Sequence, residues 1–357
     1  MRSAAPRHSR EQPPPAPARV LVKEVNWLGD LVMSLPALRA IRRAFPAAHL
    51  AVLVKQELAS FFDGAYWLDE VLTYRVGRSL RGIADRARVV AAIRAGRFDL
   101  AIVFPRSFES AFWTALGGVP RRVGYEADGR GLLLTDRVRR SAALLRGHQA
   151  HDYLHLLSTT LGIAGEPSDC RIDVADRHRA TMGAWLTAHR RSRGPLVALA
   201  VAAAYGPAKE WPAARWTALI DRLAERYGAE CVLVGAPGER QRSADIAAPS
   251  RHGALVAAGE TGVGEAIALL ARCDAFVGND SGSMHVAGAL GIPTVGVFGS
   301  TNPERTAPLG ARTRIAYRQV ACSPCLERTC RFGHYECLHA IEVDEIERAL
   351  VELGALS

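Results

Sequence analysis

Short apolar runs alternate with amphipathic stretches over the first third of the chain. The segments between the runs have apolar residues at helical spacing, as in LVMSLPALRAIRRAF. Strands that alternate with helices in this way form β-α-β units, which build a parallel sheet. The expected strands, between residue 19 and about residue 125, are RVLVKEV, HLAVLV, DEVLTY, DLAIVF and RRVGY.

A second series of the same kind begins at Pro195. The chain therefore has an α/β fold with two Rossmann-like, doubly wound domains in tandem. We place the domains at 20–175 and 176–357, because a polar stretch at about 165–194, partly helical in pattern, separates the two series. Such sheets bind ligands beyond the carboxyl ends of their strands, so two facing sheets enclose a cleft. The second series of expected strands is LVALAVAA, ECVLVGA, ALVAAG, AFVGN and TVGVFG.

One strand of the second series ends in polar residues at the start of a helix. AFVGN is followed by Asp280, Ser281 and Gly282, and then by a helical stretch closed by Gly291. Asp280 or Ser281 is a natural N-cap. The free N–H groups of such a helix start favour a phosphate or diphosphate, and His285, one turn on, can donate a hydrogen bond to an anion. The alternative is that Asp280 is only a cap and His285 only a half-buried polar residue.

The first strand of the first domain ends in a similar way, at NWLGD. Asp30 lies in the opening turn of the next helix, where a capping side chain contributes about 0.5–2 kcal/mol. It can also act in the cleft as a general base. A carboxylate with an ordinary pKa near about 4 cannot ionise a sugar hydroxyl beforehand, but it can accept the proton as the hydroxyl attacks.

Two further loops follow strand ends in the second domain. In AAAYGPAKEWP, a Gly-Pro turn shapes the loop, and Lys209 can reach a phosphate as a mobile point charge. The alternative is a solvated surface lysine. The loop VGAPGER, at 234–240, is placed to contact a nucleoside.

Composition and charge narrow the class of protein. Of the 357 residues, 49% are hydrophobic and 23% charged, as in a soluble globular protein. The chain contains no apolar run long enough for a membrane span. Residues 1–19, rich in Pro, Ala and Arg, lack the apolar centre of a signal peptide and are expected to form a disordered tail. We therefore expect a cytoplasmic protein.

The formal net charge of +9 indicates attraction to nucleic acid, an anionic membrane surface or phosphorylated small molecules. The basic residues are spread along the chain, and the sequence shows no pattern typical of nucleic-acid recognition. We expect no nucleic-acid partner.

Five stretches follow one another from about residue 20 to residue 350. They are NWLGDLVMSLPALRAIRRAFP, SFESAFWTALGGVPRRVGYEADGRGLLLT, AAYGPAKEWP, NDSGSMHVAGALGIPTVGVFGSTNPERTAPLG and CSPCLERTCRFGHYEC. Together they resemble the glycosyltransferase family 9 heptosyltransferases, and most closely their lipopolysaccharide heptosyltransferase II group. The resemblance implies a GT-B fold, in which the first domain binds the acceptor and the second holds ADP-heptose. It also implies inverting transfer of heptose to a heptose of the lipopolysaccharide inner core, with an enzyme that is cytoplasmic or peripheral to the inner face of the inner membrane.

Matched position by position, the resemblance implies roles for single residues. Asp30 corresponds to the catalytic base. No metal or cofactor is required if Lys209 and the helix start stabilise the leaving diphosphate. The sequence has no Asp-x-Asp metal motif near the site. The residues that match donor contacts are Lys209, Asp280, Ser281, Gly282 and His285.

Arg130 and Arg106 are candidate contacts for phosphates of the acceptor. Two positions depart from the family pattern. Glu210 follows Lys209 where an arginine is expected, and Arg106 stands where the similar segment begins with Asn. Both departures concern which substrates are used more than the type of reaction.

Four cysteines are clustered near the C-terminus in the pattern C-x2-C-x4-C-x6-C. Because disulfides are disfavoured in the cytoplasm, the cluster suggests a structural zinc site or, less readily, an iron–sulfur cluster, with His334 and His339 as possible replacement ligands. The alternative is a set of reduced structural cysteines or an adventitious disulfide. The candidate ligands are Cys322, Cys325, Cys330 and Cys337.

Three other functions compete with heptosyl transfer. A GT-B transferase with another nucleotide sugar or acceptor would keep the mechanism. A nucleotide-sugar epimerase has a similar two-domain fold and needs no acceptor. A module that binds nucleic acid or a partner protein would leave the five ordered motifs without a role. Trp27, Trp67 and Trp113 could form a membrane-docking surface, although tryptophans in α/β domains are usually part of the core.

Overall fold

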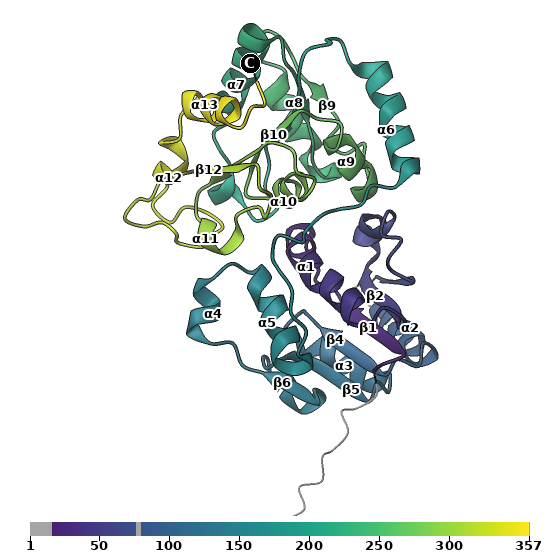
Figure 1. Ribbon diagram of the computed structural model, residues 1–357. Helices are drawn as coiled ribbons and strands as arrows, with labels where there is room; N and C mark the ends of the chain where they lie inside the picture. The colour runs from purple at the N-terminus through teal and green to yellow at the C-terminus, as the bar shows by residue number, and fades with distance from the viewer. Residues whose placement is uncertain (1–15, 76–79, 357) are drawn as a thin grey trace, which may run out of the picture.

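Each series of strands forms one parallel sheet in the computed structural model, which describes residues 16–75 and 80–356 (Figure 1). The first sheet has the order β3-β2-β1-β4-β5-β6, with every neighbouring pair parallel. Its strands are β1 (Arg19–Lys23), β2 (His49–Lys55), β3 (Glu70–Tyr74), β4 (Leu100–Val103), β5 (Arg121–Tyr125) and β6 (Asp136–Val138). The helices of this lobe are α1 (Leu28–Ala44), η1 (Gln56–Phe62), α2 (Leu80–Ala95), α3 (Phe108–Leu116), η2 (Arg130–Leu133), α4 (Ala142–Arg146) and α5 (Ala150–Leu161).

The second sheet repeats this topology, with the order β12-β11-β10-β7-β8-β9. Its strands are β7 (Leu196–Ala200), β8 (Glu230–Leu233), β9 (Leu255–Val256), β10 (Ala275–Asn279), β11 (Thr294–Phe298) and β12 (Thr313–Tyr317). Its helices are α6 (Asp176–His189), η3 (Pro207–Lys209), α7 (Ala213–Tyr227), η4 (Pro237–Glu239), α8 (Arg240–Ala247), α9 (Val263–Leu270), α10 (Gly282–Ala289), α11 (Pro303–Thr306), α12 (Glu336–His339) and α13 (Val343–Glu352). Both sheets have the doubly wound order of a Rossmann fold, which confirms the expected fold class.

Burial of both faces explains why the strands are continuous apolar runs. In β1, Val20 and Val22 pack in the core beneath α1, whereas Leu21 packs on the opposite face with residues of α2 and α3. Every residue of β7 and β10 is buried. Parallel sheets covered by helices on both faces have this pattern.

The strands β6 and β12 are absent from the sequence prediction. Both lie at the outer edge of their sheets. Each is partly exposed, with polar residues inside a short run. An edge strand that is half exposed carries a weak apolar signal.

The segments next to the expected domain boundaries are well defined. The expected tail lies outside the described residues as far as residue 15. The backbone N–H groups of Ala18 and Arg19 both donate to the Asp99 carboxylate, at 2.9 and 2.8 Å, so the chain is held in place at the start of β1. Helix α6 packs on α9 of the second lobe. In the part of the chain that the structure describes, no helix is both long and apolar enough to cross a membrane.

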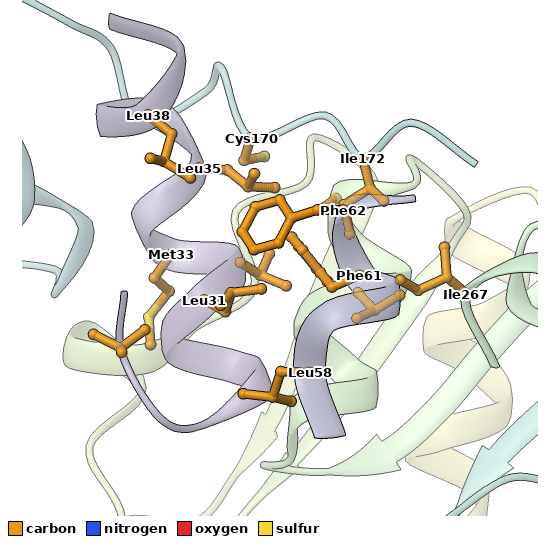
Figure 2. Packing of buried hydrophobic residues seen from close by; sticks show 14 of the residues in the cluster. Leu31, Met33, Leu35, Leu38, Leu58, Phe61, Phe62, Cys170, Ile172 and Ile267 are labelled. Atoms are coloured by element: carbon orange, nitrogen blue, oxygen red, sulfur yellow. The ribbon is translucent and has the colours of Figure 1, made fainter. Parts of the chain in front are cut away.

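The two lobes share a continuous apolar contact. Leu31 and Leu35 of α1 pack with Phe61 and Phe62 of η1, and Ile267 of α9 in the second lobe joins the same cluster (Figure 2). This burial stabilises the arrangement of the lobes as well as each lobe by itself.

Helices α1 and α10 approach closely where the lobes meet, as Figure 1 shows. A Cβ added at Gly282 would lie 2.8 Å from the Cβ of Leu28, and one added at Gly29 would lie 2.7 Å from the ring of His285. Glycine is therefore required at both positions if the two helix starts are to face each other at this distance.

We expect Gly282→Ala to destabilise the protein, because the added methyl group pushes α10 away from α1. Overpacking of this kind costs about 1–3 kcal/mol. Each kcal/mol lowers the Tm of a domain of about 150–250 residues by about 2–4 °C. Gly238→Ala is the matched control, since a Cβ there meets nothing within 4 Å among the described residues. Calorimetric Tm values that are equal for the two variants would contradict the tight contact.

Candidate active site

The carboxylate of Asp30 lies in the first turn of α1, directed away from the helix backbone. Trp27 occupies the N-cap position of that helix. Asp30 Oδ1 accepts a hydrogen bond from Gln149 Nε2 at 2.9 Å. Burial raises the pKa of Asp30, while the bond from Gln149 and the positive charge of Lys209 oppose that rise. Asp30 is therefore a partly buried, oriented carboxylate rather than a simple helix cap.

The residues after β10 come to the same place from the second lobe. Asn279 ties the end of β10 to the loop after β7, because its side chain donates to Val201 O and accepts from Trp211 N. Asp280 Oδ2 accepts from Lys209 Nζ at 2.6 Å and from Thr301 Oγ1 at 2.7 Å. Asp280 therefore orients Lys209 and does not cap α10.

The start of α10 keeps its hydrogen-bonding capacity free. Ser281 occupies the N-cap position, and its buried Oγ has no hydrogen-bond partner among the described residues. The first N–H groups of a helix have no partner within the helix itself. Unpaired donors and a positive dipole end at this point suit an anionic ligand.

His285 lies one turn into α10, fully enclosed at the lobe interface. Its Nε2 is 3.9 Å from Asp280 Oδ1, and its Nδ1 has no partner within the described residues. Burial lowers the pKa of His285 to about 4. The ring is therefore neutral near pH 7, with one donor and one acceptor nitrogen. It can donate a hydrogen bond to a ligand, as the sequence suggested, but without a positive charge.

Glu210 is turned into a separate ion pair. Its Oε2 lies 2.8 Å from Arg242 Nη2, and its Oε1 accepts from Ala203 N at 3.2 Å. The negative charge that departs from the family pattern is therefore balanced by an arginine of α8. Lys209 keeps its own partner, Asp280.

A cavity of about 580 Å³ opens in front of Asp30. Trp27, Arg106 and Gln149 are among the first-lobe residues that line it, and Arg305 enters from the second lobe. Three arginines and three aspartates line the wall, so the cavity suits a polar ligand, and its arginines can pair with the phosphate of a phosphorylated sugar.

The two arginines expected to bind the acceptor differ in where they lie relative to the cavity. Arg106 is exposed and lines the cavity. Arg130 is fully buried, and its guanidinium donates to the carbonyl groups of Tyr125, Pro105 and Ser107. It holds the loop beneath the cavity and is not among the residues of the cavity wall, so a contact between Arg130 and the acceptor is not supported.

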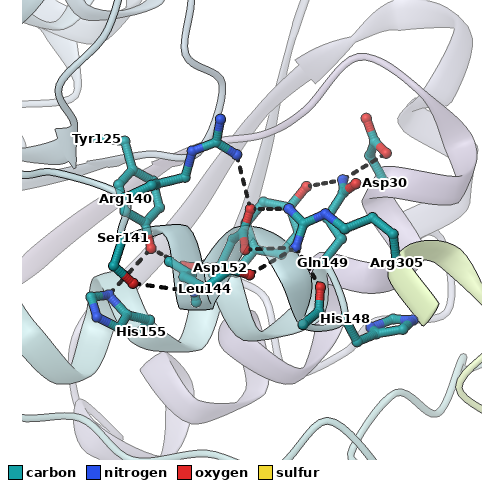
Figure 3. A network of polar contacts seen from close by, with 12 residues as sticks. Asp30, Tyr125, Arg140, Ser141, Leu144, His148, Gln149, Asp152, His155 and Arg305 are labelled. Carbon is teal, nitrogen blue, oxygen red and sulfur yellow. Dashed lines mark hydrogen bonds and ion pairs between the residues drawn. The ribbon is translucent and has the colours of Figure 1, made fainter. Parts of the chain in front are cut away.

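A polar network joins the second lobe to Asp30 (Figure 3). Arg305 of α11 pairs with Asp152 of α5, with Nη1 to Oδ1 at 3.1 Å, and its Nη1 also donates to Gly147 O at 2.7 Å. The carbonyl of Arg305 accepts from Gln149 N at 2.9 Å, and the side chain of Gln149 holds Asp30. Arg140 completes the pairing of Asp152, at 3.2 Å. A change in the position of α11 is thereby linked to the orientation of Asp30.

The sequence analysis did not single out Gln149, Asp152 or Arg305. Arg305 lies inside one of the quoted stretches, STNPERTAP, but an arginine there carries no local signal of a contact with α5. Glu24 was missed as well. It is buried close to Asp30, accepts from Ser34 Oγ at 3.0 Å, and has a pKa that burial raises to about 7. The one signal in the sequence that could have indicated Glu24 is a pair of charged residues at the end of an apolar strand, as in VLVKEV, because buried charges are costly unless they have partners.

The cysteine cluster contains free thiols. Cys322 Sγ lies 3.9 Å from His334 Nε2, and Cys337 is buried nearby. Backbone N–H groups that follow Cys330 lower the pKa of its thiol. No group of three or more His, Cys, Asp or Glu side chains within residues 16–75 and 80–356 is arranged to hold a metal ion. The side chains as placed do not form a zinc site, and structural zinc stays a prediction.

Known proteins that are similar to this chain in sequence and fold belong to one family. The model of glycosyltransferase family 9 (heptosyltransferase) matches residues 86–336. Lipopolysaccharide heptosyltransferase 2 of Escherichia coli K12 is 28% identical over 354 residues, which cover 95% of this chain and 98% of the relative. Lipopolysaccharide heptosyltransferase 2 of Salmonella typhimurium LT2 is 29% identical over 312 residues, covering 83% of this chain and 87% of the relative.

Solved structures agree on the fold. The structure of E. coli ADP-heptose lipopolysaccharide heptosyltransferase II has a TM-score of 0.80 at 24% identity, covering 94% of this chain and 98% of that one. A family 9 glycosyltransferase from Veillonella parvula has a TM-score of 0.85 at 22% identity, covering 94% and 97%. These likenesses confirm the expected GT-B arrangement of the two lobes. Because the family model spans well over half of the sequence, the chain belongs to glycosyltransferase family 9 and is a glycosyltransferase of the heptosyltransferase kind.

Proposed function

We propose that this enzyme transfers heptose from ADP-heptose to a heptose of the lipopolysaccharide inner core, with inversion at the anomeric carbon. The observation that carries the proposal is the meeting of Asp30, held by Gln149, with the Lys209–Asp280 pair of the other lobe. The names of the curated relatives support lipopolysaccharide as the acceptor, and E. coli WaaC, a heptosyltransferase solved with ADP-2-deoxy-2-fluoro heptose, supports the donor.

The donor diphosphate fits the start of α10. Its N–H groups and the Ser281 hydroxyl can donate to phosphate oxygens, and Lys209 supplies a positive charge beside them. Asp280 uses Oδ2 to hold Lys209 and Thr301, which leaves Oδ1 as an acceptor for a hydroxyl of the sugar. This division of roles explains why a carboxylate lies next to a diphosphate site.

The acceptor enters from the cavity of the first lobe. Its hydroxyl oxygen forms a bond to C1 of heptose while the bond from C1 to the ADP oxygen breaks. The hydroxyl proton passes to Asp30, and ADP leaves with the electron pair. Because Asp30 and the diphosphate site lie on opposite lobes, the acceptor hydroxyl attacks C1 from the face opposite ADP. Attack from that face inverts the anomeric centre.

Two features lower the barrier to this reaction. Burial raises the pKa of Asp30, which makes its carboxylate a stronger proton acceptor when the hydroxyl attacks. Charge develops on the ADP oxygen in the transition state, where Lys209 and the amides of α10 are already oriented. Both groups therefore favour the transition state over the bound substrates.

The reaction is tested by following ADP release from ADP-heptose in the presence of a phosphorylated core acceptor that carries heptose. We expect release to depend on that acceptor. Release with UDP-sugars and none with ADP-heptose would favour a transferase with another donor, and isomerisation of the nucleotide sugar alone would favour an epimerase.

Asp30→Asn should abolish transfer but leave donor binding intact, because an amide keeps the shape of the side chain and cannot accept the proton. The loss in kcat should be about 10²–10⁴-fold. Calorimetry with ADP-heptose provides the control for folding and binding. A nearly normal kcat after Asp30→Asn would exclude Asp30 as the base.

Gln149→Leu should move the acidic limb of the kcat/KM profile to higher pH. Asp30 must be ionised to act, and the bond from Gln149 lowers its pKa against the effect of burial. Without that bond the pKa rises further, so activity is lost at a higher pH as the solution is acidified. Leu145→Ala, at another residue of the cavity wall, is the matched control. An unchanged profile after Gln149→Leu would argue against this bond in the working enzyme, whatever the change in kcat.

Lys209→Gln should weaken ADP binding. A hydrogen bond assisted by a charge contributes about 1.5–3 kcal/mol, which corresponds to about a tenfold or greater rise in Kd. Lys55→Gln, a change at a lysine of the first lobe at the end of β2, should leave ADP binding normal. Equal affinities in the two variants, measured by calorimetry, would place the diphosphate away from Lys209.

A further inference from the structure

Helix α3 has an apolar face that is only partly covered by the described part of the chain. Ser110, Ala111, Trp113 and Thr114 form its buried face. On the other side, Phe108 and Phe112 stack at 5.8 Å between ring centroids and are 47% and 39% exposed. Leu116, one turn further on, is 45% exposed. We call Phe108, Phe112 and Leu116 the α3 stripe.

Neighbouring elements extend this apolar surface. Leu132 of η2, which packs beside α3, is 91% exposed. Ile83 of α2 is also exposed. Arg86, one turn further along α2, pairs with Glu109 at the start of α3, with Nε to Oε1 at 2.5 Å, so this part of α2 lies beside α3. Single exposed apolar residues are common, but exposed apolar residues gathered on three neighbouring elements indicate an interaction site.

The α3 stripe begins at the mouth of the cavity. Arg106 and Ser107 line the cavity, and Phe108 is the next residue along the chain. Trp27, on the same wall, is exposed. An acceptor whose sugar occupies the cavity would therefore have the rest of its molecule beside the α3 stripe.

The charges around the stripe favour an anionic partner. Residues 106–146 contain eight arginines, no lysine and four acidic residues. Glu109, Glu126 and Asp136 are paired with Arg86, Arg139 and Arg121. Asp128 is exposed and takes part in none of the ion pairs found among the described residues. The exposed residues Arg106, Arg137 and Arg146 take part in none of the ion pairs found within the described ranges. Three exposed arginines without an ion pair against one such aspartate give the segment that contains the α3 stripe a positive balance of free charge.

We propose that the α3 stripe and the exposed arginines of its segment dock this enzyme on the surface of an anionic lipid bilayer. Apolar side chains enter the boundary between headgroups and acyl chains, and the arginines pair with lipid phosphates. The choice of a lipid surface rests on the proposed function, because that acceptor is anchored in a membrane. A second copy of the chain fits less well, since it would bring two positively charged segments together.

The three tryptophans considered from the sequence as a membrane-docking surface contribute little to the α3 stripe and its surroundings. Trp113 is buried on the inner face of α3, with its ring 5.0 Å from that of Tyr74. Trp67 is partly buried, and its Nε1 donates to Asp173 at 3.0 Å. Trp27, alone of the three tryptophans, is exposed and lines the cavity together with Arg106 and Ser107, which precede the α3 stripe.

The test is flotation of the full-length enzyme with vesicles. Wild-type protein should bind vesicles of phosphatidylethanolamine with phosphatidylglycerol and bind pure phosphatidylcholine vesicles weakly, with binding reduced by salt. The triple variant Phe108→Ser, Phe112→Ser, Leu116→Ser should lose about tenfold or more of its affinity for the anionic vesicles. The matched control is Tyr66→Ser with Val351→Ser, at two exposed apolar residues away from the α3 stripe, and it should bind as the wild type does.

Equal vesicle binding by the triple variant and the wild type would overturn the proposal, as would a wild type that does not bind anionic vesicles. A wild-type dimer that the triple substitution converts to a monomer, without vesicle binding by either, would show that a second copy covers the stripe. Vesicle binding is measured without catalysis, so failure of the heptosyltransfer assay does not decide it. Activity on a short, water-soluble acceptor should be the same in the triple variant as in the wild type, which shows that the variant is folded.

Discussion

The close contact between the starts of α1 and α10 is the constraint on which the site depends. Each helix follows a central strand of its sheet, and the doubly wound topology directs both helix starts toward the other lobe. Gly29 and Gly282 permit the approach, and His285 is enclosed by it. In this arrangement a carboxylate of one lobe faces the proposed diphosphate site of the other, so a reaction that needs both can occur only where the lobes meet.

The charged groups at this contact are buried or partly buried, and each has a partner of opposite charge or a hydrogen-bond donor. Lys209 is paired with Asp280, Arg305 with Asp152, and Asp30 accepts from Gln149. Paired charges in a partly dry site interact more strongly than the same charges in water, and each pair fixes the direction of a side chain that a substrate will meet. The pairs that cross between lobes also link the spacing of the lobes to the geometry of the site.

Local patterns predicted the fold and the residues at strand ends, because a buried parallel strand and the helix start after it are both formed by residues that are consecutive in the sequence. The prediction placed Lys209 and His285 in one site, where the structure brings them together. It failed where the decisive contact is distant in sequence. Gln149 and Arg305 gain their roles only when α5 and α11 meet, and the burial of Arg130 depends on three carbonyl groups of a folded loop. The edge strands β6 and β12 were not predicted, because their partial exposure weakens the apolar pattern of their sequences.

The most direct test of this account is a crystal structure of the enzyme with a non-transferable fluorinated analogue of ADP-heptose. The account predicts that the diphosphate lies on the N–H groups at the start of α10 beside Lys209, with C1 of the sugar facing Asp30 across the contact of α1 and α10. A diphosphate bound elsewhere, or a sugar whose C1 faces away from Asp30, would contradict the proposal that the two helix starts together form the active site.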